Sequence, residues 1–110
     1  MLPKENRLKK KKDFETIFKS GKLIKGKDIL VKYLYNKEED SKIGFIVSKK
    51  VSKKATERNK IKRRFREIIR ANKEKIKKGL GIIIIALPSS KKLSFKEIDS
   101  EIKNILEIIK

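Results

Sequence analysis

Basic side chains gather in residues 49–66 (KKVSKKATERNKIKRRFR), where ten of 18 residues are Lys or Arg and Glu57 is the only acid. Ammonium and guanidinium groups bind phosphate, and the planar arginine fork can form two parallel bonds to it. Most basic runs are solvated helix faces in which acids alternate with bases. Here Arg58, Lys62 and Arg66 repeat at i, i+4 and i+8 without the usual intervening glutamates. The segment therefore predicts a nucleic-acid-binding surface, although charge placement alone does not choose between RNA and DNA.

The same segment has the periodicity of an amphipathic helix. At about 100° per residue, Ile61, Phe65 and Ile68 fall in one sector together with Ile69. The opposite side carries cations and one amide, so we expect one buried face and one cationic face. The candidate phosphate-binding residues are Lys49, Lys50, Lys53, Lys54, Arg58, Asn59, Lys60, Lys62, Arg63, Arg66 and Arg70.

Residues that could perform hydrolysis are scarce. The chain has no His and no Cys, which excludes disulfides and thiolate metal sites. A protein that holds two catalytic metal ions needs clustered carboxylates. The four aspartates lie on different predicted elements: Asp13, Asp28, Asp40 and Asp99. We therefore assign no catalytic residue and no metal ligand to the protein.

Composition is typical of a small protein with a polyanionic partner. The 110 residues suit a single domain over 1–110, with residues 1–10 as a basic N-terminal arm. A net charge of +19 is hard to keep on a compact domain unless a polyanion screens it, which favours nucleic acid first and an anionic membrane second. The longest apolar run, residues 80–88, is too short to cross a bilayer, and the amphipathic faces are needed for the core. We expect a cytoplasmic protein with no membrane partner.

Helices are predicted at both ends of the chain and after the basic loop. Phe14, Ile17 and Phe18 at i, i+3 and i+4 indicate a helix over about residues 11–20. The amphipathic helix should run from about 55 to 77. A last helix should follow the capping-box pattern that Ser94 and Glu97 form.

Strands are predicted between these helices. Residues 23–24 suggest a short edge strand, and residues 29–35 a longer one with Tyr33 and Tyr35 on the same face. The short polar loop 36–42 should join it to a strand over 43–48 as an antiparallel pair. The apolar run 81–87 predicts a central strand covered on both faces. The order α-β-β-β-α-β-α indicates an α+β fold with helices packed on a sheet.

Several of these residues together resemble the signature of the bacterial ribonuclease P protein. The motif elements are Phe45-Ile46-Val47-Ser48-Lys49-Lys50, Ala55, Arg58-Asn59-Lys60-Ile61-Lys62-Arg63 and Arg66-Glu67. At the N-terminus, Arg7-Leu8, Asp13-Phe14, Phe18 and Gly21 also match. The chain departs from the family at Lys60, which occupies a position where the family signature has an arginine. It also departs at Lys32, which lies where the family often has an aromatic residue on the cleft face.

This resemblance implies a fold and a set of partners. The fold is a two-layer α/β sandwich of the ribosomal-protein-S5-domain-2-like type, with a left-handed β-α-β crossover that breaks the usual right-handed rule. The resemblance implies that an RNA subunit performs the hydrolysis with Mg²⁺, that the basic residues bind this RNA, and that the protein binds no cofactor itself. It also implies that a cleft between the sheet and the first helix holds the single-stranded 5′ leader of precursor tRNA. Its candidate contacts are Phe14, Phe18 and Lys32, although both rings could equally be core residues.

Two other functions fit parts of the sequence. A structural RNA-binding protein, either ribosomal or an RNA chaperone, would share the charge and the fold class. The Arg58–Arg63 motif and the Phe14/Phe18 pair favour the ribonuclease P role instead. A nucleoid-type DNA binder is disfavoured because neither a helix-turn-helix nor a basic-zipper pattern is present, and we expect no DNA partner.

Overall fold

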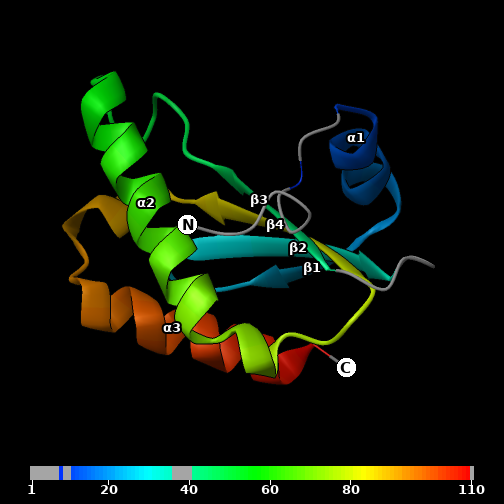
Figure 1. Cartoon of the computed structure of the whole chain (residues 1–110). Coiled ribbons are helices and arrows are strands. Elements are labelled where there is room, and N and C mark those ends of the chain that lie inside the picture. The colour runs from blue at the N-terminus through cyan, green and yellow to red at the C-terminus, as the bar shows by residue number, and fades with distance from the viewer. Residues whose placement is uncertain (1–7, 9–10, 36–40, 110) are drawn as a thin grey trace.

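A computed structural model describes residues 8, 11–35 and 41–109 and contains a four-stranded sheet with helices on both faces (Figure 1). The predicted order α-β-β-β-α-β-α is confirmed. The elements are α1 (Lys11–Ser20), β1 (Lys22–Lys25), β2 (Ile29–Tyr35), β3 (Lys42–Ile46), α2 (Ala55–Ala71), β4 (Leu80–Ala86) and α3 (Phe95–Ile108), with short 3₁₀ turns η2 (Lys73–Lys75) and η3 (Pro88–Lys92). Of the predicted N-terminal arm only Leu8 lies within the described residues. Its backbone N–H donates to the carbonyl of Ile43 at 3.1 Å.

The strand order is β1-β2-β4-β3, so the predicted antiparallel pairing of 29–35 with 43–48 is wrong. β4 lies between them, antiparallel to β2 and parallel to β3. The most apolar strand takes an interior position because both of its faces can be buried there, and Ile82 and Ile83 are both fully buried. The connection between Tyr35 and Lys42 can cross one intervening strand, because that needs only about 10 Å.

The connection from β3 through α2 to β4 joins neighbouring parallel strands and is left-handed, as expected (Figure 1). α2 and α3 pack on one face of the sheet. There Phe65, Ile68 and Ile98 are buried against Val31 and Ile84. α1 packs on the other face through Ile17, which contacts the buried side chains of Leu8 and Ile83. This arrangement leaves part of the α1 face of the sheet without a helix over it.

Hydrogen bonds near the helix ends explain where α2 ends and where α3 begins. α2 ends at Ala71, not near 77. The buried Asn72 caps it, because its side chain donates to the carbonyl of Ile68 at 2.7 Å beside its own backbone N–H at 3.0 Å. The capping box at α3 is confirmed. The Ser94 hydroxyl accepts from the Glu97 backbone N–H at 3.2 Å, and the Glu97 carboxylate accepts from the Ser94 N–H at 3.1 Å.

Candidate nucleic-acid interface

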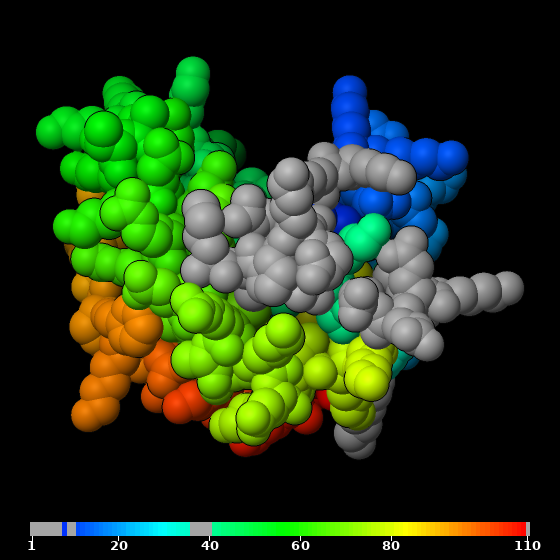
Figure 2. Space-filling model, viewed as in Figure 1, coloured from blue at the N-terminus to red at the C-terminus, as the bar shows by residue number. Residues whose placement is uncertain are grey.

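One side of α2 is exposed and forms a cationic strip. The helix lies on the face of the molecule that is turned to the viewer in Figure 2. The predicted buried residues Ile61, Phe65, Ile68 and Ile69 all lie in the core. On the outer side the side chains are exposed or half-buried: Asn59, Lys62, Arg63, Arg66 and Arg70. Among the described residues, no ion pair neutralises a member of this strip. The helix therefore offers these side chains to an external anion.

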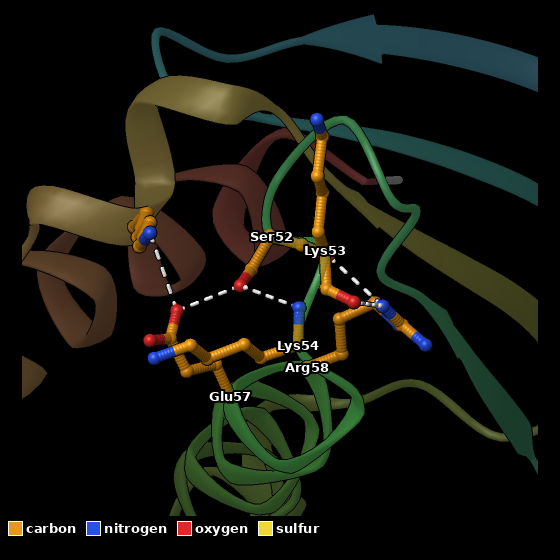
Figure 3. Close-up of polar contacts among 6 residues, drawn as sticks. Ser52, Lys53, Lys54, Glu57 and Arg58 are labelled. Atoms are coloured by element: carbon orange, nitrogen blue, oxygen red, sulfur yellow. Dashed lines mark hydrogen bonds and ion pairs between the residues drawn. The ribbon is translucent and has the colours of Figure 1, made fainter.

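The loop that precedes α2 adds further cations at the N-terminal end of the strip. Lys49, Lys50, Lys53 and Lys54 are all exposed, whereas Ser52 between them is buried. Lys60 on the first turns of α2 is also exposed. The Lys53 side chain points away from the polar cluster around Ser52 (Figure 3). The lysines predicted from the sequence thus lie at one end of the strip.

Arg58 supports this loop from within. Its guanidinium Nη1 donates to the carbonyls of Ser52 and Lys53, each at 2.9 Å (Figure 3). One nitrogen can make both bonds because it carries two N–H donors. Arg58 was predicted only to contact phosphate, and no sequence pattern indicated this internal role.

Glu57 lies in the same cluster and joins three segments. Its carboxylate accepts a hydrogen bond from the Ser52 hydroxyl at 2.7 Å, and Lys91 Nζ of η3 lies 3.2 Å from it. The Ser52 hydroxyl also accepts from the Lys54 backbone N–H at 3.3 Å. The hydrogen bond from Ser52 lowers the pKa of Glu57, and Lys91 lowers it further. No sequence pattern indicated this contact, because Lys91 is remote in the chain.

Phe45 on β3 supports Arg66 of the strip. The Arg66 guanidinium lies over the Phe45 ring, 6.0 Å from its centroid, and Phe45 stacks on the buried Phe65 ring at 6.1 Å. Such a cation–π contact orients the arginine while leaving its N–H donors available to a phosphate. Phe45 belongs to the signature quoted above, but no sequence pattern indicated that it supports Arg66.

A second surface lies on the α1 face of the sheet. Phe18 is 38% exposed, and Lys32 Nζ lies 5.5 Å from its ring centroid. The same ammonium donates to the Phe18 carbonyl at 2.6 Å, at the C-terminal end of α1. Phe14 is half-buried and packs on β3 at Gly44. Tyr33 and Tyr35 point to the opposite face, as alternation predicted, where their rings meet edge to face at 6.4 Å.

Two glycines set how closely α1 approaches this face. A Cβ atom at Gly44 would lie 2.5 Å from Phe14 Cζ, and one at Gly81 would lie 2.8 Å from Ile17 Cδ1. Each glycine therefore makes room for a side chain of α1. A cavity beneath α1 is lined by Leu8, Asp13, Thr16, Ile17, Leu34, Lys42 and Gly81. None of the predicted leader contacts lines it, so these contacts belong to the open surface beside α1.

The described part of the chain holds no group of three or more acidic residues close enough to bind a metal ion. None of its helices is long and apolar enough to cross a membrane. A cationic helix face and a partly open sheet face bearing aromatic and basic side chains define an RNA-binding module, which is the class of protein that this fold and site describe.

Comparisons with known proteins agree with this class. The family model described as Ribonuclease P matches residues 2–110. A ribonuclease P protein component from Clostridioides difficile is 45% identical over 101 residues, covering 91% of this chain and 88% of the relative. The ribonuclease P protein from Thermotoga maritima superimposes with a TM-score of 0.87 at 35% identity, covering 94% of this chain and 97% of that one. The Staphylococcus aureus protein also gives 0.87, at 34% identity, with coverages of 96% and 95%.

The chain belongs to the ribonuclease P protein family. It is accordingly a subunit of a tRNA-processing endoribonuclease and has the RNA subunit of that enzyme as its partner.

Proposed function

We propose that the cationic strip and the preceding lysine loop bind the ribonuclease P RNA. The observation that carries this proposal is the side of α2 that bears Asn59, Lys62, Arg63, Arg66 and Arg70 without an internal ion pair among the described residues. Arginine forks can bind phosphate oxygens in pairs, and each neutralised phosphate releases condensed counterions. Lys49, Lys50, Lys53, Lys54 and Lys60 extend the same surface, while Arg58 holds the loop that carries two of them.

We further propose that the α1 face of the sheet binds the 5′ leader of precursor tRNA. Phe18 offers an exposed ring on which an unpaired base can stack, and Lys32 beside it offers an ammonium group to the leader backbone. Phe14 packs one edge of its ring against Gly44 and, being half-buried, can offer the rest of the ring to the leader. Stacking and backbone contacts tolerate many sequences, which suits a leader of variable sequence.

In this proposal the Mg²⁺ ions that hydrolysis needs belong to the RNA subunit, and the protein holds no cofactor. The chain's lack of His and Cys and its scattered aspartates support this assignment. The protein acts in the cytoplasm with its RNA, binds neither DNA nor membrane, and assists leader removal by holding both RNA partners.

Reconstitution with the cognate RNA subunit and a precursor tRNA at low magnesium tests the proposal. Protein alone should leave the precursor intact, and adding it to the RNA subunit should raise the rate of leader cleavage. A structural RNA-binding protein or RNA chaperone would bind the RNA without raising specific 5′ cleavage. Cleavage by protein that is free of RNA would refute the assignment of the active site to the RNA.

A further inference from the structure

Glu57 is an acid within a surface that otherwise attracts phosphate. It is the only Asp or Glu in residues 49–66. By charge alone it should weaken RNA binding, because it repels phosphate and neutralises a neighbouring lysine. Its presence there needs a physical explanation.

The contacts of Glu57 give that explanation. Its carboxylate accepts from the hydroxyl of Ser52, a buried residue that in turn accepts from the Lys54 backbone N–H. On its other side it pairs with Lys91, which docks η3 against the start of α2. The loop 52–54 is therefore held from two sides, by Glu57 through the Ser52 hydroxyl and by Arg58 through the Ser52 and Lys53 carbonyls (Figure 3).

We propose that Glu57 is a positioning residue for RNA binding, which fixes the loop 52–54 so that Lys53 and Lys54 lie beside the cationic strip of α2. Without its carboxylate, Lys91 loses its ion-pair partner, the charge of Lys54 loses a nearby acid that balances it, and the buried Ser52 hydroxyl loses its acceptor. Repulsion between the positive charges then moves the loop. RNA binding must order the loop again before its lysines contact phosphate, and this ordering costs conformational entropy. This inference rests on the proposed role of α2 and its loop as the RNA-binding surface.

The proposal reverses the sign that charge alone predicts. Glu57→Ala removes a negative charge from a phosphate-binding surface, so simple electrostatics predicts tighter binding. A positioning role predicts that affinity for the RNA subunit falls about three- to tenfold, the factor expected for lost internal hydrogen bonds. The matched control is Glu67→Ala, because Glu67 is an exposed acid of the same helix with no ion pair among the described residues. That control should bind as tightly as the unmodified protein or slightly more tightly.

The binding experiment uses the full chain and the cognate ribonuclease P RNA without tRNA, at fixed salt and magnesium. Each variant is measured below its melting temperature, as checked by circular dichroism. Glu57→Gln should give an intermediate affinity, because an amide oxygen can accept from Ser52 but cannot neutralise Lys91. Ser52→Ala should weaken binding like Glu57→Ala, and the double variant should be no weaker than Glu57→Ala alone, since both act through one contact.

Three results would overturn the inference. These are Glu57→Ala binding as tightly as Glu67→Ala, additive effects of Ser52→Ala and Glu57→Ala, or Glu57→Gln binding no better than Glu57→Ala. Arg66→Ala in the same series separates this failure from that of the proposed function. If Arg66→Ala weakens binding and Glu57→Ala does not, only the positioning role is refuted. If neither variant weakens binding, the RNA-binding surface itself has been misassigned.

Discussion

The exposed ring of Phe18 permits a test that separates leader binding from binding of the RNA subunit. Phe18→Leu removes the aromatic face but keeps a large apolar side chain against the sheet. Stacking on an aromatic ring contributes about 1–3 kcal/mol per base. The affinity of the holoenzyme for precursor tRNA should therefore fall by about 5- to 150-fold. Mature tRNA lacks the leader, so its affinity should not change.

The stability cost of this substitution should be small. Phe18 is already 38% exposed, and the contact that leucine loses is the cation–π pair with Lys32. Such a pair at an exposed site contributes about 0.5–1 kcal/mol. A loss of that size lowers the melting temperature of a domain of this length by only about 2–4 °C. A ring with a core role would instead lower stability further and weaken binding of both tRNAs alike.

The assay measures the ratio of precursor to mature tRNA affinity, beside the melting temperature. Tyr35→Leu is a matched control, because Tyr35 is 46% exposed and shares the sheet face of Tyr33, opposite Phe18 and Lys32. That control should leave the ratio unchanged. An unchanged ratio for Phe18→Leu with a strongly lowered melting temperature would refute the stacking argument and return Phe18 to the core.

Two further predictions concern the cationic strip and the contact between α3 and the end of α2. Arg66→Ala should weaken binding to the RNA subunit by about 1–3 kcal/mol and make the slope of log affinity against log salt shallower by about one, while the melting temperature changes little; a large fall in melting temperature would show that its contact with Phe45 is structural. The pKa of Asp99 is lowered, first by the hydrogen bond from Lys103 and then by Asn72, so its contribution to stability is present above the ordinary carboxyl range and is lost as pH falls through the lowered pKa. The difference in unfolding free energy between the unmodified protein and Asp99→Asn should therefore shrink as pH falls from about 6 to about 3, and an unchanged difference would refute the linkage.

Local patterns in the sequence predicted the faces of the helices and strands correctly. Ile61, Phe65 and Ile68 are buried because residues three and four apart share one side of any helix, whatever surrounds it. Side chains alternate along a strand, so Lys32 was likewise placed on the face of the sheet opposite to that of Tyr33. These predictions succeeded because they depend on backbone geometry within a single element.

The end of α2 shows where local periodicity fails. Ile76 continues the apolar spacing, and the helix was expected to reach about residue 77. The helix ends at Ala71, where the buried side chain of Asn72 caps it by donating to the Ile68 carbonyl and to the Asp99 carboxylate, the latter at 3.1 Å. Asp99 belongs to α3, so part of the reason for this boundary lies in another element of the fold.

Strand order and the contacts around the RNA-binding loop were decided by the tertiary structure alone. The loop between β2 and β3 is short enough for a hairpin, yet β4 takes the place between them because its two apolar faces gain more from burial there. Glu57 meets Lys91, and Arg66 meets Phe45, across segments that the chain brings together only when the sheet and α2 pack. The sequence by itself determined which side chains each element can offer to RNA, since that depends on the period of the element. Which neighbours hold those side chains in place depends on contacts between distant residues, and only packing of the whole chain selects them.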